Sequence, residues 1–232
     1  MKIMSFNTQH CLNYIEREID FQIMADAIKK CDADIVGLNE IRGKGESLDY
    51  EEQTAILSEL TGLKNSYFAE AIRFEEKNPY GNALISKYPI ISAEVIPVPD
   101  PNPKTGNGYY ETRCLLKAKL EGGITVLVIH FGLNPDEQEN AVKTVVENLE
   151  NEKCILMGDF NVCPDNDVLK PIRDRMKDTA DVFEKPFKSF PSDNPDRKID
   201  YIFVSPDVEV ISADIPAIVA SDHRPHTAEI NV

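Results

Sequence analysis

An aspartate and an asparagine two residues apart are the side chains whose types and spacing best suit chemistry. Asp159 and Asn161 close an apolar run that begins at Ile155. Such a run is typical of a buried strand, and residues i and i+2 of an extended segment point the same way. A carboxylate that accepts a proton or binds a cation would lie beside an amide that donates to an oxyanion, which suits a metal-bound phosphate. On its own, the pair is more often a turn or a helix cap.

The same arrangement recurs where other apolar runs begin or end. The polar residues at these places are Asn7, Glu40, His130, Asp200 and the pair Asp222 and His223. Taken singly, Glu40 is as readily a helix cap or a surface acid, and a histidine that ends a strand is more often structural. Ligands of α/β proteins bind beyond the ends of strands, and this many coincidences favour one shared polar site.

The strands and helices that must position these residues interleave along the chain. Strands are expected over residues 2–6, 35–38, 67–71, 82–86, 90–98, 112–120, 125–130, 154–157, 201–204, 209–212 and 227–231. Helices are expected over residues 17–30, 50–60 and 135–150. Residues 99–108 are rich in turn formers, and residues 121–123 indicate a hairpin. This mixture of crossovers and hairpins predicts an α/β (α+β) chain with mixed sheets.

Composition indicates a single domain over residues 1–232. Hydrophobic residues make up 42% and charged residues 28% of the chain, which is ordinary for a globular protein with a full core. No apolar run approaches the roughly 20 residues that cross a bilayer, and Asn7 and Gln9 interrupt any leader-like segment. We therefore expect a cytoplasmic protein that has no membrane partner. The five cysteines are scattered and form no Cys-x-x-Cys pair, which argues against a disulfide framework or a zinc–thiolate site.

The charge of the chain argues against duplex nucleic acid as a partner. It has 40 acidic and 25 basic residues, a formal net charge of −15, and no run rich in lysine or arginine. Duplex binding depends on cationic contacts to phosphates, and an acidic chain repels polyanions. Solubility is the simpler consequence of this charge, but the charge still lowers the expectation of a nonspecific nuclease.

The ordered set of polar residues resembles the endonuclease/exonuclease/phosphatase superfamily, the deoxyribonuclease I-like proteins, in its small bacterial form. The matching motifs are Asn7, Glu40, His130, Gly158-Asp159-Phe160-Asn161, Asp200-Tyr201 and Ser221-Asp222-His223. Members include pancreatic-type deoxyribonucleases, abasic-site endonucleases, sphingomyelinases and inositol polyphosphate 5-phosphatases. The resemblance spans nearly the whole chain. It implies a four-layer αββα sandwich, in which two mixed β-sheets pack face to face with helices outside and strand ends converge at one rim.

The resemblance implies a catalytic Mg²⁺, for which Mn²⁺ would be a substitute. Mg²⁺ prefers oxygen ligands and keeps several waters, so one or two carboxylates suffice. Glu40 is the first choice as its ligand, and Asp222 is the second carboxylate. Asn7 would supply an oxygen beside the ion or orient its water.

Catalytic roles also follow from the resemblance. His223 would hydrogen-bond the scissile phosphate or take a proton from the attacking water, while Asp200 orients its other ring nitrogen. Asp159 would align or deprotonate that water. Asn161 and His130 would donate to phosphate oxygens.

Substrate contacts are less sharply defined by the sequence. Arg113 either contacts phosphate or simply pairs with Glu111, and Asn82 is expected to contact substrate. Deoxyribonuclease-like members pair the second histidine, here His130, with a glutamate. The candidates for that glutamate are Glu70, Glu75 and Glu111.

The sequence thus favours a magnesium-dependent phosphoesterase that attacks a small, soluble phosphodiester or phosphomonoester with in-line water. The chain contains no tryptophan, and its short connections include no long aromatic insertion that would dock on a polymer or a lipid. We expect a monomer with a small phosphorylated substrate. One alternative is a DNA or RNA endonuclease or exonuclease, which a basic surface patch would favour. Another is an inactive binding protein on the same scaffold, against which the complete set of Glu40, Asp159, Asn161 and His223 argues.

Overall fold

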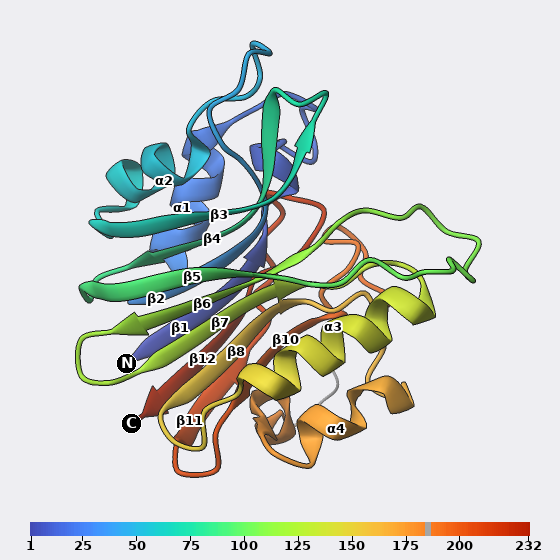
Figure 1. The fold of residues 1–232 in the computed structure, drawn as a ribbon. Coiled ribbons are helices and arrows are strands. Elements are labelled where there is room, and N and C mark those ends of the chain that lie inside the picture. Colours follow the sequence, from blue (N-terminus) through green and yellow to red (C-terminus); the bar gives the residue numbers. More distant parts are fainter. Residues whose placement is uncertain (184–186) are drawn as a thin grey trace.

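Two six-stranded β-sheets lie face to face in the computed structural model, which describes residues 1–183 and 187–232 (Figure 1). The first sheet has the order β11-β12-β1-β2-β4-β3 and the second has the order β5-β6-β7-β8-β10-β9. The strands of the first sheet are β1 (Lys2–Asn7), β2 (Ile35–Arg42), β3 (Asn65–Phe74), β4 (Asn78–Ser86), β11 (Glu209–Asp214) and β12 (His226–Asn231). Those of the second are β5 (Ile90–Pro97), β6 (Cys114–Leu120), β7 (Thr125–His130), β8 (Cys154–Asp159), β9 (Lys177–Asp178) and β10 (Asp200–Val204).

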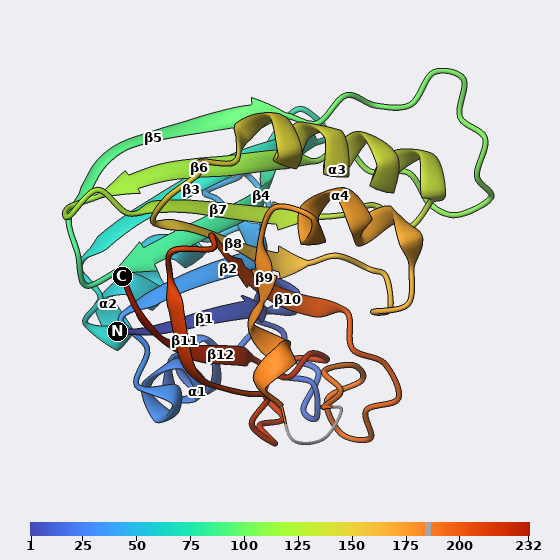
Figure 2. The same cartoon turned by 90° about the horizontal axis from the view of Figure 1, so that it is seen from below.

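Helices cover the outer faces of both sheets, as the two views show (Figures 1 and 2). The helices are α1 (Phe21–Cys31), α2 (Gln53–Thr61), α3 (Pro135–Asn148) and α4 (Lys170–Arg173), with short 3₁₀ turns η1 (Gln9–Cys11), η2 (Asp167–Leu169) and η3 (Thr179–Val182). The first two helices pack on the first sheet, and the last two pack on the second. The predicted four-layer αββα sandwich is therefore confirmed. Among the described residues, no helix is long and apolar enough to cross a membrane.

Each sheet contains one parallel strand pair, which makes both sheets mixed, as predicted. Strands β1 and β2 are parallel with α1 as their crossover, and β7 and β8 are parallel with α3 as theirs. The neighbouring pairs are antiparallel, including the hairpin of β6 and β7. Its turn contains Gly122 and Gly123, both in the left-handed region that favours glycine.

Alternating side chains divide the apolar core between the layers. Ile3 points into the space between the sheets, where it joins a cluster that includes Val128 and Ile155. Its neighbour Met4 points outward and packs in the cluster of α1 and α2. Period-two alternation along a strand produces this division. Because burial of each large apolar side chain contributes about 1.5–3 kcal/mol, the sheets form a firm support for the residues at their ends.

The first helix begins later than the apolar spacing predicts. The prediction starts at residue 17, whereas α1 starts at Phe21. The side chain of Asp20 accepts hydrogen bonds from the backbone N–H groups of Gln22 and Ile23, which is the geometry of a helix N-cap. Arg17 has a positive φ of 60°, so the preceding segment turns before the helix begins.

The ends of the central strands bring the polar residues together. Asn7 of β1 lies opposite Asn39 of β2, and His130 of β7 lies opposite Asp159 of β8. Asp159 also lies opposite Asp200, the first residue of β10. Because β1 and β2 are in the first sheet and the others are in the second, this rim is assembled from both sheets.

One buried amide ties the two sheets together below that rim. The Nδ2 atom of Asn39 donates to the carbonyl oxygen of Ile129 at 2.9 Å and to Oδ1 of Asn82 at 2.8 Å. Its Oδ1 atom accepts from the backbone N–H of Asp159 at 2.9 Å. Asn39 therefore connects β2 of the first sheet to β7 and β8 of the second, directly below the end of β8.

Candidate active site

Asp159 and Asn161 keep their polar groups together through a tight turn at the end of β8. The backbone N–H of Asn161 donates to Oδ1 of Asp159 at 2.9 Å, and Asn161 has a left-handed φ of 52°. Its Nδ2 atom donates to the carbonyl oxygen of Phe131 at 3.0 Å and lies 3.2 Å from Nε2 of His130. The carboxylate, the amide and the imidazole thus lie side by side.

Gly158 belongs to this turn because no larger residue fits. A Cβ atom at this position would lie 1.8 Å from the carbonyl oxygen of Ile129. The close approach of β7 and β8 therefore explains the glycine of the Gly-Asp-Phe-Asn motif in physical terms.

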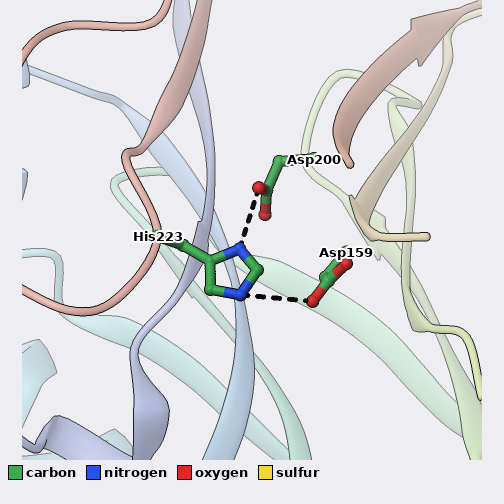
Figure 3. Close-up of side chains that lie close together, drawn as sticks. All are labelled: Asp159, Asp200 and His223. Carbon is green, nitrogen blue, oxygen red and sulfur yellow. Dashed lines mark hydrogen bonds and ion pairs between the residues drawn. The ribbon is translucent and has the colours of Figure 1, made fainter. Parts of the chain in front are cut away.

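His223 lies between two aspartates (Figure 3). Its Nδ1 atom is 2.9 Å from Oδ2 of Asp200, and its Nε2 atom is 3.6 Å from Oδ2 of Asp159. All three side chains are almost fully buried. The predicted pairing of His223 with Asp200 is the contact observed, and the second ring nitrogen faces the carboxylate that ends β8.

The two aspartates set the protonation of His223. Burial favours the neutral imidazole, but the charges of Asp200 and Asp159 outweigh it and raise the pKa of His223 to about 10. Burial likewise opposes the charge of Asp159, yet His223 and His130 hold the pKa of that carboxyl well below its usual range. At neutral pH, therefore, an imidazolium faces a carboxylate.

We expect His223 of the metal-free protein to remain doubly protonated at pH 8, as measured by ring ¹⁵N chemical shifts. The folded pKa of about 10 lies above the unfolded value of 6.5, so this ionisation stabilises the fold fully below about pH 6.5. The stabilisation disappears as the pH rises toward 10. In Asp200→Asn, the ring should lose its second proton at lower pH. A wild-type midpoint near 6.5 would contradict the assignment of the two aspartates as its charge partners.

Asn7 joins the carboxylates of the two sheets. Its Nδ2 atom donates to Oε1 of Glu40 at 3.0 Å and to Oδ2 of Asp159 at 3.1 Å. Its Oδ1 atom accepts from the backbone N–H of Gln9 at 3.0 Å. Sequence reasoning expected Asn7 to offer an oxygen to a cation or to orient its water. In the structure its nitrogen faces the carboxylates, because Gln9 engages the oxygen.

Glu40 reaches the rim from a strained backbone. Its φ is +59°, within an irregularity of β2 between Leu38 and Ile41. A left-handed residue other than glycine costs about 1–3 kcal/mol and persists only where the surroundings enforce it, often at functional sites. Burial opposes the charge of Glu40, but the charge of His130 and the hydrogen bond from Asn7 lower the pKa of its carboxyl.

The acids at this rim form a set of oxygen donors that fits a hard divalent cation. Asp222 lies near Glu40 and Asp159: burial raises the pKa of Asp222, and the charges of those two carboxylates raise it further. Its Oδ1 atom accepts from the Ser221 hydroxyl at 3.0 Å. Carboxylates held close together repel one another, and a bound cation relieves that repulsion. Carboxylate oxygens such as those of Glu40, Asp222 and Asp159 are the donors that such cations prefer. Among the described residues, the possible ligand atoms of Asp159, Asp200 and His223 all lie within 4.8 Å of one another.

Arg113 forms the ion pair with Glu111 that was one of its two expected roles, and it also reaches His130. Its guanidinium pairs with Glu111, and its Nη1 atom lies 3.0 Å from Nδ1 of His130. A guanidinium only donates, so Nδ1 must accept and the ring proton lies on Nε2, which is 3.5 Å from Oδ2 of Asp159. Of the candidate partner acids, Glu111 acts on His130 through Arg113, whereas Glu70 binds Arg73 at the surface.

Three asparagine and histidine positions correct or extend the sequence analysis. Asn82 is buried, accepts from Asn39 and donates to the carbonyl oxygen of Cys114, so it belongs to the inter-sheet network. Asn39 was not singled out, although an asparagine directly before Glu40 in an apolar run was a signal. His10 was also missed; its Nδ1 atom lies 3.9 Å from Oε2 of Glu40.

Residues 4–223 match the sequence profile described as the Endonuclease/Exonuclease/phosphatase family. This match includes every residue placed above at the rim. The chain belongs to the endonuclease/exonuclease/phosphatase family. Its members are generally hydrolases of phosphoester bonds.

Relatives of this family cover the whole chain. The YbhP protein of Escherichia coli (strain K12) is 25% identical over 258 aligned positions, which cover 100% of this chain and 96% of YbhP. A family structure from Beutenbergia cavernae DSM 12333 has a TM-score of 0.77 at 20% identity and covers 100% of this chain and 71% of that one. The mannosyl-6-phosphatase of Bacteroides thetaiotaomicron VPI-5482 has a TM-score of 0.75 at 16% identity, with 100% of both chains covered. At these identities the structural likeness shows the fold.

Proposed function

We propose that this endonuclease/exonuclease/phosphatase family member is a divalent-cation-dependent phosphoesterase that hydrolyses a small phosphorylated molecule. The observation that carries the proposal is the clamped His223: one aspartate on each ring nitrogen, at a rim where Asn161, His130 and Glu40 also converge. An imidazolium, an amide and an imidazole N–H are donors that suit the oxygens of a phosphate. The adjacent carboxylates suit a water and a cation.

The protonation states divide the labour among these residues. The two aspartates keep His223 protonated, so it donates to a phosphate oxygen instead of accepting a proton. Asp159 accepts a hydrogen bond from the attacking water and aligns it, because a carboxyl of such low pKa is a weak base. Asn161 and the Nε2–H of His130 donate to further oxygens of the phosphate. The water oxygen bonds to phosphorus in line as the bond to the leaving oxygen breaks, the water loses its proton to solvent past Asp159, and the leaving oxygen takes up a proton from solvent.

Glu40 and Asp222 would hold the cation, with Asn7 fixing the position of Glu40. A bound Mg²⁺ or Mn²⁺ would neutralise phosphate charge and assist the leaving oxygen. The positions of Glu40 and Asp222 would fix where the charge of the cation lies relative to the groups that donate to the phosphate. Nε2 of His223 and Nδ2 of Asn7 both face Oδ2 of Asp159, and Asn7 connects that carboxylate to Glu40.

A small substrate fits the charge of the chain better than duplex nucleic acid does. The net charge is −15, and Arg113, the arginine nearest His130 among the described contacts, is already paired with Glu111. Tracking a polyanion requires many cationic contacts, whereas a single phosphate needs only the donors at the rim. The mannosyl-6-phosphatase of the same fold gives a sugar phosphomonoester as the first substrate class to test.

Purified protein with millimolar Mg²⁺ or Mn²⁺ should hydrolyse small phosphodiesters or phosphomonoesters, and exhaustive chelation should abolish the activity. The same cations should raise the melting temperature, because they bind the folded carboxylate cluster and not the unfolded chain. A cation at 100 times its Kd stabilises by about 2.7 kcal/mol. The panel should contain aryl phosphomonoesters and diesters, sugar phosphates and supercoiled plasmid at about 0.15 M salt, where screening is realistic.

Glu40→Gln is the matched control for this panel, because it keeps the size of the side chain and removes the charge that the cation needs. It should lose both the hydrolysis and the rise in melting temperature. Full activity after chelation would contradict the cation requirement. Rapid nicking of the plasmid that Asp159→Asn abolishes would replace the small substrate with the nuclease alternative.

A further inference from the structure

The segment that follows Asn7 adopts an unusual backbone. Gln9, His10 and Cys11 are consecutive and have φ values of 47°, 47° and 63°, all in the left-handed region. None of them is glycine, and left-handed non-glycine residues normally occur singly. Three in succession therefore require the surrounding structure to hold them.

Buried contacts hold this turn from both sides. Gln53, fully buried in α2, donates from Nε2 to the carbonyl oxygen of His10 at 2.8 Å and accepts at Oε1 from the backbone N–H of Arg42 at 2.9 Å. The backbone N–H of Gln9 donates to the side chain of Asn7, and Cys11 is buried in the core. The backbone of His10 is thus fixed relative to β2.

This backbone places the ring of His10 beside Glu40. Its Nδ1 atom is 3.9 Å from Oε2 of Glu40, and each side chain is 23% exposed. That separation is too long for a hydrogen bond. Two ligand atoms about 2.1 Å from one ion lie about 3 Å apart when adjacent and about 4.2 Å apart when opposite, so one ion between them fits this gap. Glu40 itself occupies the left-handed region, so both partners reach this point from strained backbones.

We propose that His10 is a ligand of the divalent cation held by Glu40, so that the site offers one nitrogen donor among its oxygens. The inference rests on the cation of the proposed function. The contacts of Glu40 support it, because Asn7 donates to Oε1 while Oε2 is the oxygen that faces His10. Imidazole suits first-row transition ions, whereas Mg²⁺ prefers oxygen. The site should therefore bind Mn²⁺ more tightly than Mg²⁺.

Metal binding without substrate tests this inference. Calorimetry should compare Mn²⁺ and Mg²⁺ on the wild type, His10→Asn, Gln22→Asn and Glu40→Gln. Asparagine tolerates the left-handed backbone, and its Oδ1 atom lies close to where Nδ1 of histidine does, so the substitution replaces the nitrogen donor with an oxygen donor. His10→Asn should weaken Mn²⁺ binding by roughly 10–100-fold, the range found when the ligand environment of a metal is disturbed, and weaken Mg²⁺ binding much less. Gln22→Asn, on the exposed side of α1, should bind both ions as the wild type does.

Pulsed electron paramagnetic resonance of bound Mn²⁺ gives a second readout, since a coordinated imidazole couples its ¹⁴N nucleus to the ion. That coupling should be present in the wild type and absent in His10→Asn or, if asparagine impairs folding, in His10→Gly, which relieves the left-handed backbone. Unchanged Mn²⁺ affinity and ¹⁴N coupling in the His10 variants, with binding lost in Glu40→Gln, would overturn the role of His10 while leaving the cation site intact. Undiminished binding in Glu40→Gln would instead overturn the cation site itself.

Discussion

Asp159→Asn is expected to lower turnover by roughly 10²–10⁴-fold or more, because the variant loses the group that aligns the attacking water. The substitution keeps the shape of the side chain and removes one charge. His223 then loses one of the carboxylates that raise its pKa, so the donor that faces the phosphate is weakened as well. Turnover of the small phosphoester selected by the substrate panel is the measurement. The melting temperature should change far less than the rate.

Asp174→Asn provides the matched control, because Asp174 is exposed on the far side of the second sheet and the substitution removes the same charge. It should leave turnover within about twofold, as surface changes usually do within ±0.5 kcal/mol. Wild-type turnover in Asp159→Asn would remove Asp159 from the chemistry. Equal losses in the two variants would point to overall charge as the cause.

His223→Gln and Asp200→Asn should each reduce turnover strongly, and the double variant should be little worse than His223→Gln alone. The reason is that Asp200 acts only through His223, to which it is bonded at 2.9 Å. Residues that act as a unit give strongly non-additive losses. Removal of the imidazolium should cost about 10²–10⁴-fold, and removal of its buried partner should lower the pKa of the remaining imidazole.

The double-variant cycle also separates a mechanistic pair from a structural one. If Asp200 only supported the fold, Asp200→Asn would lower the melting temperature without shifting the pH profile of turnover. The expected result is a shifted pH profile, because the protonation of His223 depends on Asp200. Strictly additive losses in the double variant would show that the two residues act independently.

The fold was predictable because its strands carry strong local signals. The apolar run of residues 125–130 coincides with β7, and the run that begins at residue 154 extends as β8 to Asp159. The predicted start of a helix was wrong where a side-chain N-cap, and not the apolar spacing, determines the first helical residue. Asp20 starts α1, although the apolar spacing extends earlier in the chain. The two-residue strand β9 is too short to leave any periodicity in the sequence.

The candidate site was predictable where residue type reveals chemistry, and it was not where backbone geometry does. Aspartates and histidines at strand ends can be recognised as candidate site residues from the sequence, because their types suit catalysis and they end apolar runs. The left-handed turn at His10 does not, because its residues are not the glycines that normally mark such geometry. The pairing of Asn39 across the sheets depends on contacts 90 and 120 residues away in the chain, which no local pattern encodes.

The rim draws its residues from both sheets, and Asn39 holds the sheets together by hydrogen bonds. The proposed activity should therefore depend on how the two sheets are aligned. Glu40 and Asn7 move with one sheet, while Asp159, His130 and Asp200 move with the other. A sub-global opening that slides the sheets apart would separate Glu40 and Asn7 from Asp159 and His130 while each sheet remained folded. On warming, activity should then be lost at a lower temperature than secondary structure. Displacement of one sheet relative to the other, and not the unfolding of either sheet, would then limit the temperature at which the protein is active.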